Sequence, residues 1–333
     1  MSKSSHILRF IAHLLQEVSP SSPKGEMMRN QFKYVPPALI NNVTYAIAML
    51  AIFIVLEIYG AEVWASLPGT VSLELLFIGG GFTFYMAWFW LCAAPYLLLD
   101  HYKKPAFLFK YKIQTGKDGS TSTLAPGRLK HTVWVVLKNQ FLGTLPVIVG
   151  VYYLMVWRGM SYDQAFPSWT EIVWHLAVIL LVEEILFYTV HRTLHQKRWY
   201  GSIHRIHHEY KESICIATHY VHFAEHMLGN LFPIFAGTLL LGAHPITLIL
   251  WIGMAVTNAL HTHSGYHFPW MAYSLHHDYH HYRIRGNYGV LGLLDWIFKT
   301  DGPFAMLHKA HKAKGEKQAA EHSSASGAFS LEG

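Results

Sequence analysis

The stretch at residues 172–195 reads IVWHLAVILLVEEILFYTVHRTLH. Its first part, residues 172–190, is mostly apolar and long enough to cross, as a helix, a hydrocarbon layer about 30 Å thick. It runs directly into His191-Arg-Thr-Leu-His195, in which two imidazoles stand one helical turn apart and face the same way. The stretch therefore predicts a membrane span that ends in a pair of candidate metal ligands.

The composition of the whole chain agrees with a membrane protein. Of its 333 residues, 52% are hydrophobic and 14% are charged, whereas a soluble domain carries roughly 25% charged residues. These values exclude an ordinary soluble globule, and the hydrophobic content excludes intrinsic disorder. The net charge of +6 does not indicate a nucleic-acid partner, because no motif of a nucleic-acid-binding fold accompanies it and the Lys and Arg residues lie mainly between the apolar runs.

Apolar runs along the chain predict the fold class. Four of them approach the length of a span: residues 39–59, 75–99, 141–157 and 172–190. A fifth run, residues 227–260, is interrupted by Pro233 and by GAHP at residues 242–245, and its two halves are each about 15 residues long. It predicts a tight helical hairpin that returns the chain to the side it left, and leaves open whether the arms cross the membrane fully. We expect an all-α, multi-pass membrane bundle of about four spans plus this hairpin, with a cytosolic, histidine-rich helical cap.

Basic residues near the spans predict how the protein is oriented in the membrane, and the spans divide the chain into segments. The loop 100–138 holds eight Lys and Arg residues against two Asp residues, so it should be cytosolic, and each histidine group then ends on that face. The predicted segments are an N-terminal cytosolic part (1–38), the spans with their basic loop (39–190), a histidine-rich catalytic region containing the hairpin (191–302) and a disordered tail (303–333). Residues 7–17 predict either an amphipathic helix on the membrane surface or a helix packed on the protein.

Histidine is the residue type that points to chemistry. The chain has 24 His against 20 Asp and Glu together, and only two Cys, which excludes both a disulfide scaffold and a thiolate metal site. Ten of the histidines fall into two HxxxH and two HxxHH groups, whose helical spacing turns each group to one face. These candidate metal ligands are His191, His195, His204, His207, His208, His263, His267, His277, His280 and His281.

Ten imidazoles are too many for one metal ion, so two metals with about five nitrogens each fit better. Imidazole suits iron, copper, nickel and zinc, and the spacing does not choose among them. The chain lacks the HExxH pattern of zinc proteases and the ExxH pattern of carboxylate di-iron bundles. His222 and Glu225 are candidates to orient ligand rings from behind, and Asp278 is a candidate hydrogen-bond acceptor for a ligand ring. We expect no catalytic residue beyond the metal ligands.

Several of these motifs together resemble the fatty acid hydroxylase/sterol desaturase superfamily of membrane di-iron oxygenases. The resemblance covers about residues 95–302 and is closest to sterol C4-methyl oxidases and fatty acid hydroxylase domain-containing proteins. Besides the histidine groups, it rests on DHYKKP from residue 100, FKYKIQ from 109, HSGYHFPW from 263, GNYG from 286 and LDWIFKTD from 294. In several methyl oxidases a carboxylate stands at the position of His267, which leaves the substrate open but not the metal site.

The resemblance implies that the ten histidines hold two iron ions. It further implies molecular oxygen as co-substrate, electrons from NAD(P)H through cytochrome b5 or its reductase, and residence in the endoplasmic reticulum membrane with the active site facing the cytosol. The implied function is hydroxylation of an unactivated C–H bond of a lipid, foremost the C4-methyl group in sterol biosynthesis.

Other functions remain open from the sequence. One is a fatty acyl or sphingolipid hydroxylase, a desaturase or an aldehyde-processing enzyme of the same superfamily; another is a non-catalytic membrane metal-binding regulatory protein. A haem carrier would use only two to four of the histidines. The basic loop either docks an acidic electron donor or only follows the positive-inside rule. The oligomeric state is not indicated.

Overall fold

The computed structural model describes residues 59–114, 126–268 and 270–301. Within these ranges the chain is helical, and its one strand-like pairing is an isolated bridge between Lys112 and Tyr266. The all-α prediction is confirmed. The predicted segments 1–38 and 303–333, and all but the last residue of the predicted span 39–59, lie outside the described residues.

Long helices, a short helix and π-helical turns make up the first half of the described chain. In chain order the elements are η1 (Leu75–Gly80, π), α4 (Gly81–Tyr102), α5 (Ala106–Phe109), α6 (Pro126–Asn139), η3 (Gln140–Thr144, π), α7 (Leu145–Trp157) and α8 (Trp169–Leu194). Short helices alternate with long ones in the second half. They are α9 (Lys197–Tyr200), η4 (His204–Glu209, 3₁₀), η5 (Cys215–His219, 3₁₀), α10 (Phe223–Glu225), η6 (His226–Leu231, π), α11 (Phe232–Leu241), α12 (Pro245–His263), α13 (Leu275–Arg283) and α14 (Leu293–Phe298).

Four of the described helices are long and apolar enough to cross a membrane, which confirms the multi-pass prediction: Leu75–Tyr102, Gly127–Trp157, Trp169–Leu194 and Pro245–His263. The second begins well before the predicted residue 141. Its first part, α6, mixes polar and apolar residues, and it continues through the π-turn η3 into the apolar α7 without a break.

The predicted hairpin is present, but its break differs from the expectation. Pro233 does not interrupt the first arm: the chain stays helical from the π-turn η6 into α11, and Pro233 lies at the beginning of α11, directly after that π-turn. The arm ends at Gly242, which adopts the left-handed conformation (φ 61°), and α12 starts at Pro245. At 19 residues, α12 is longer than the predicted half-hairpin and is itself a candidate span.

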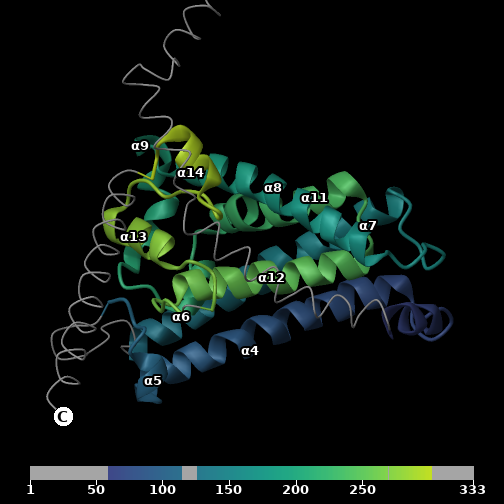
Figure 1. The fold of residues 1–333 in the computed structure, drawn as a ribbon, viewed down its shortest axis with the longest axis horizontal. Helices are drawn as coiled ribbons and strands as arrows, with labels where there is room; N and C mark the ends of the chain where they lie inside the picture. Colours follow the sequence, from purple (N-terminus) through teal and green to yellow (C-terminus); the bar gives the residue numbers. More distant parts are fainter. Residues whose placement is uncertain (1–58, 115–125, 269, 302–333) are drawn as a thin grey trace, which may run out of the picture.

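Close backbone approach and polar contacts between helices hold the bundle together. At Gly237 of α11, a Cβ atom would lie 2.8 Å from the Cα of Ile179 in α8, so only glycine lets the two helices meet here. The indole N–H of Trp88 in α4 donates to the Gly253 carbonyl of α12 at 3.0 Å. Figure 1 accordingly shows α12 with α4 on one side and α8 and α11 on the other.

Two of these helices, α8 and α12, end at the same end of the bundle. In Figure 1 this is the left-hand end, where α9, α13 and α14 also gather. Because α8 ends at Leu194 and α12 ends at His263, both carry candidate metal ligands to this end.

Candidate metal centre

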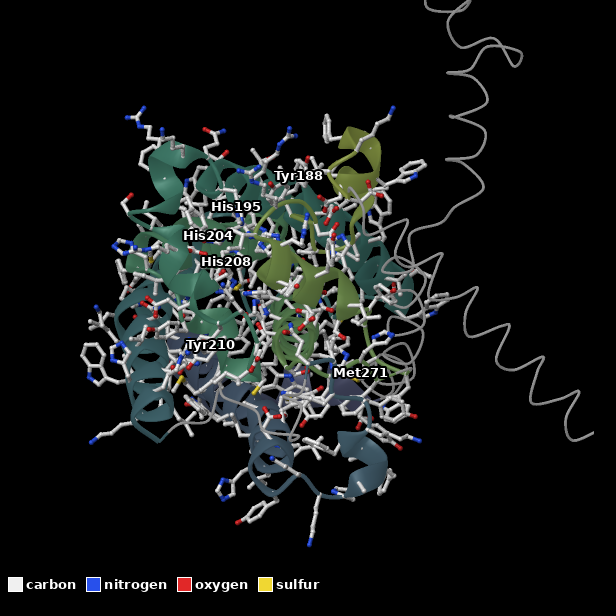
Figure 2. All side chains as sticks on the ribbon, turned by 90° about the vertical axis from the view of Figure 1, so that its left-hand side faces the viewer. Tyr188, His195, His204, His208, Tyr210 and Met271 are labelled. Atoms are coloured by element: carbon white, nitrogen blue, oxygen red, sulfur yellow. The ribbon has the colours of Figure 1, made fainter. Side chains whose placement is uncertain are left out.

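A first group of five histidines converges from three elements. His191 and His195 come from the end of α8, where His195 keeps the helical hydrogen bond to the His191 carbonyl (3.1 Å). His204 and His208 come from η4, and His280 comes from α13. The ligand nitrogens of the five lie within 4.8 Å of one another, and all but His195 are buried. Figure 2 looks onto this end of the molecule and shows His195, His204 and His208 side by side.

A second group of four buried histidines lies beside the first. His263 stands at the last position of α12, His277 and His281 lie one turn apart on α13, and His207 comes from η4. The Nε2 atom of His263 lies 3.3 Å from that of His207 and 2.8 Å from that of His277, and the Nε2 atoms of His277 and His281 are 3.0 Å apart.

The two HxxHH motifs are each divided between the groups. In each motif, the residues four positions apart serve one group and the middle histidine serves the other. Thus His204 and His208 lie in the first group with His280, whereas His277 and His281 lie in the second with His207. This corrects the expectation that each motif turns to a single face. The first motif forms a 3₁₀ helix rather than an α-helix, and the two groups lie close enough for one motif to reach both.

Hydrogen bonds behind several of the rings fix which nitrogen of these imidazoles carries the proton. In four of the histidines Nδ1 faces a backbone carbonyl oxygen, which can only accept. The pairs are His191 with Tyr288 (2.8 Å), His263 with Ala259 (2.8 Å), His280 with Gly286 (2.6 Å) and His281 with Tyr210 (2.9 Å). Nδ1 of these rings must therefore be protonated, which leaves the Nε2 lone pair pointing into the group.

The spacing of the Nε2 atoms fits ligands around a metal ion. In the first group, neighbouring Nε2 atoms of His195, His204, His208 and His280 are 2.9–3.2 Å apart. Metal–imidazole bonds of about 2.0–2.1 Å place adjacent ligand nitrogens about 2.9–3.4 Å apart. Lone pairs that face one another at this distance repel, and a cation between them removes the repulsion. The donor set thus fits two metal ions without selecting the element.

Burial and neighbouring imidazoles also keep the ligand rings neutral. Both effects disfavour the charged form, burial being the larger, and hold the pKa of six histidines outside the spans well below 6.5: His204, His207, His208, His277, His280 and His281. Neutral imidazole is the form that binds a metal, so the rings need not lose a proton first.

Glu225, one of the predicted supporting residues, lies behind the ring of His204. Its carboxylate is 2.6 Å from Nδ1 of His204, and both side chains are buried. Burial raises the pKa of Glu225. A metal ion bound to the His204 ring would lower the pKa of Glu225, because its positive charge stabilises the carboxylate.

The other two predicted supporting residues make different contacts. The His222 ring caps α10 by accepting from the Ala224 N–H, and both carboxylate oxygens of Asp278 accept from the Gln114 side-chain amide at 3.0 Å. Burial raises the pKa of Asp278 to about 6.

His267 is the one predicted ligand that the structure brings to neither group. The helix α12 ends at His263, and Gly265 turns the chain with φ 72°. The following residues pair with residues 111–113 instead, through the Gly265 carbonyl and the His267 N–H. The ring of His267 lies 3.3 Å from the Ser274 hydroxyl. Residues four positions apart converge only on a helix, and the second HxxxH motif is not helical. The ligand roles of all ten histidines stay predictions.

A loop whose supporting role the sequence did not indicate supplies much of the support. Residues 286–291 carry the carbonyls that hold His191 and His280, and two buried carboxylates anchor this loop. Glu184 of α8 accepts from the N–H groups of Val290, Leu291 and Leu294 at 2.8, 2.8 and 3.0 Å. Asp295 accepts from the N–H groups of Tyr288 and Gly289. In the sequence, only the GNYG run marks this loop. Its supporting groups are backbone carbonyls, which every residue type carries, so no residue pattern predicts them.

A cavity of about 90 Å³ adjoins both groups. It lies between α8, α11 and α12, and its wall includes His191 and His204 of the first group and His207, His263 and His277 of the second. Apolar side chains such as Phe187, Leu194 and Ile234 share the wall. An apolar cavity of about 150 Å³ holds a benzene molecule, so this one accommodates the end of a lipid rather than a whole lipid.

Comparison with known proteins places these features in a family context. The family model described as fatty acid hydroxylase matches residues 176–300. Fatty acid hydroxylase domain-containing protein 2 of Homo sapiens is 34% identical over 69% of this chain and 68% of its own length. Methylsterol monooxygenase 2-2 of Arabidopsis thaliana is 33% identical over 71% of this chain and 90% of its own, and fatty acid hydroxylase ahd1 of Mycosarcoma maydis is 38% identical over 63% and 54%. No solved structure matches the chain.

Proposed function

The chain belongs to the fatty acid hydroxylase superfamily, and from that membership we propose that it is a di-iron oxygenase that hydroxylates an unactivated C–H bond of a membrane lipid. The substrate class that we propose is a methylsterol, oxidised at its C4-methyl group. The single observation that carries the proposal is the convergence of Nε2 lone pairs in two adjacent groups that share one cavity wall.

Two iron ions, when bound, supply the activation of molecular oxygen that cleavage of such a C–H bond needs. The chain's own residues contribute orientation and exclusion of water. Carbonyl acceptors hold the rings of His191, His263, His280 and His281, so that their Nε2 atoms keep one direction. The buried position of the groups and the apolar wall residues keep bulk water from the reacting carbon.

The choice of a methylsterol is supported by the long alignment between this chain and a methylsterol monooxygenase. The methylsterol monooxygenase of Arabidopsis thaliana aligns over 90% of its own length. The alternative is a fatty acyl or sphingolipid hydroxylase or a desaturase. It is supported by the fatty acid hydroxylase of Mycosarcoma maydis, whose sequence identity to this chain is higher although the alignment covers a smaller part of both proteins. The second alternative is a metal-binding regulatory protein without activity.

The electron donor and the membrane are part of the same proposal. Lys103, Lys104 and Lys110 are exposed and follow α4 at the end of the bundle that carries the histidine groups. A basic surface there would attract an acidic donor such as cytochrome b5, which takes its electrons from NAD(P)H. The proposed location is the endoplasmic reticulum membrane, with this end facing the cytosol.

Lipid analysis of cells that lack sterol C4-methyl oxidase tests the proposal. The wild-type chain, His207→Ala and His131→Ala are expressed at equal levels; His131 is an exposed histidine outside both groups and serves as the matched control. We expect accumulated methylsterols to be consumed with the wild type and with His131→Ala, but not with His207→Ala. Methylsterols that persist with the wild type, while a fatty acyl species gains one oxygen, would replace the substrate assignment by the first alternative.

A further inference from the structure

A buried ion pair lies beside the turn that follows α12. The side-chain amine of Lys112 donates to Oδ1 of Asp100 at 2.7 Å, and the two side chains are only 4% and 1% exposed. Tyr266 completes the cluster, because its hydroxyl donates to the same oxygen at 2.7 Å and its ring centre lies 4.4 Å from the ammonium group. Since Asp100 belongs to α4, the cluster joins the end of α4 to the turn after α12.

The ammonium group of Lys112 also contacts the end of α12. It donates to the Ser264 carbonyl at 3.2 Å, and the neighbouring Ile113 N–H donates to the Gly265 carbonyl at 2.8 Å. A cation is favourable near the end of a helix, because the last carbonyls have no partner within the helix and form the negative end of its dipole. At Gly265 a Cβ atom would lie 3.1 Å from the Lys112 nitrogen, so glycine leaves room for the ammonium group. Lys112 thus caps α12 from a distant part of the chain.

The last turn of α12 carries His263 of the second histidine group. The Ala259 carbonyl, one turn earlier, holds Nδ1 of this ring, and its Nε2 atom lies 2.8 Å from that of His277 and 3.3 Å from that of His207. Fraying of this turn would move His263 away from the other two rings. The first group takes its five members from α8, η4 and α13, so the end of α12 bears on the second group.

The energetics of a buried ion pair favour a role in positioning over a role in overall stability. Taking two charges out of water costs about as much free energy as their attraction returns, so an apolar pair of similar size often stabilises a protein equally well. An apolar pair, however, has no donor for the Ser264 carbonyl. The specific contribution of Lys112 is therefore the fixed position of the turn after His263.

We infer that Lys112 is a positioning residue for the second metal ion: together with Asp100 it holds the last turn of α12 and hence the Nε2 atom of His263. This inference rests on the two-metal part of the proposed function. Lys112 acts through α12, and it binds neither the metal nor the substrate.

Iron binding by the full chain in lipid nanodiscs tests the inference. Iron(II) is titrated without oxygen into the wild type, Lys112→Met, the double variant Asp100→Leu/Lys112→Met and Lys130→Met, in which an exposed lysine of α6 provides the matched control. We expect the wild type and Lys130→Met to bind two ions per chain. In Lys112→Met and in the double variant, one ion should bind as before and the other about 10- to 100-fold more weakly, as for the loss of a group that orients a ligand.

Thermal unfolding and iron spectroscopy separate positioning from a role in the fold. Lys112→Met leaves Asp100 buried without its partner and should lower the unfolding midpoint of the metal-free protein, whereas the double variant should recover most of this loss. The tightly bound ion of both variants should give the Mössbauer spectrum of the ion that His263→Ala retains. Wild-type affinity of the double variant for both ions would overturn the inference. Weakening of the ion of the first group, or a double variant whose midpoint stays as low as that of Lys112→Met, would overturn it as well.

The same proteins distinguish a failure of the inference from a failure of the proposed function. Two ions in the wild type and a weakened second ion in Lys112→Met, without any oxygenated product, would contradict the oxygenase and leave the inference standing. Oxygenated product from a wild type whose two ions bind equally well in Lys112→Met would do the reverse. A wild type that binds no iron would overturn both.

Discussion

The carboxylate of Glu225 lies 2.6 Å from Nδ1 of His204, and both side chains are buried. This contact holds the His204 ring so that its Nε2 atom faces those of His195 and His208 at 2.9 and 3.0 Å. An acceptor behind a ligand ring raises the basicity of the ring and fixes its orientation. The first group therefore depends on a residue that makes no contact with the metal position itself.

Removal of this acceptor should weaken metal binding. We expect Glu225→Ala to bind metal about 10- to 100-fold more weakly than the wild type, and Glu225→Gln to lose less because its amide oxygen can still accept. The metal content of purified protein, measured over a series of chelator concentrations, checks this. Glu171→Gln, which changes an exposed carboxylate in the first turn of α8, is the control, and identical retention by Glu225→Ala and the control would contradict the role of Glu225.

The two ends of the second HxxxH motif should differ in their effect on metal content. His263→Ala removes a member of the second group and should lower the metal content by about one ion per chain. His267→Ala should keep the wild-type content, because its ring lies beside the Ser274 hydroxyl instead. A loss of metal in His267→Ala would show that the turn after His263 rearranges when metal binds and that the sequence-based ligand set is the correct one.

The histidine groups show how far the sequence leads. Helical spacing is enough to predict that His191 and His195 converge, because α8 extends far enough to keep the hydrogen bond between them. Spacing cannot predict that His207 leaves its neighbours for the other group, since that depends on where α13 packs against η4. It also fails for His267, where Gly265 ends the helical path.

Supporting groups are harder to predict than ligands because their contacts join distant parts of the chain. Glu225 follows His204 by 21 residues, and only its residue type and nearness in the chain indicated a role. The Tyr288 carbonyl lies 97 residues after His191, and any residue type could supply it. Within the described residues, the apolar runs located three of the four candidate spans, whereas α12 was predicted only as half of a hairpin. Pro233 does not break the helix, because the π-turn η6 continues into α11.

Loss of the Glu184 carboxylate should destabilise the loop behind the metal groups. Glu184→Ala leaves three N–H groups, of Val290, Leu291 and Leu294, without their acceptor, and we expect the free energy of unfolding to fall by about 3 kcal/mol. The loop holds Nδ1 of His191 and His280, so metal content should fall as well. Thermal unfolding in detergent measures the first effect, and an unfolding midpoint equal to that of Glu171→Ala would contradict it.

The stability of the metal-free protein should decrease with acidity. Burial lowers the pKa of His226 to about 4 and that of His204 and His277 well below 6.5, whereas in the unfolded chain these rings titrate near 6.5. Between these values only the unfolded state binds protons, so stability is full above about pH 6.5 and is lost as the pH falls toward about 4. Each such histidine contributes a slope of about 1.4 kcal/mol per pH unit.

Unfolding midpoints of metal-free protein from about pH 7 to about pH 5 measure this slope. His226→Gln, which replaces a ring bonded to the Thr144 hydroxyl, should reduce it by the contribution of one histidine. A midpoint that does not change over this range would mean that the rings are charged or solvated in the folded protein, contrary to their burial.

The most direct test of the central claim follows isotopically labelled molecular oxygen into product. Purified wild-type chain is loaded with iron, supplied with reductant and a methylsterol, and the product is analysed by mass spectrometry beside His207→Ala and His131→Ala. We predict that wild type and His131→Ala place labelled oxygen on the methyl carbon and that His207→Ala does not. Unlabelled product, or labelled product formed equally by His207→Ala, would contradict an oxygenase built on the two histidine groups.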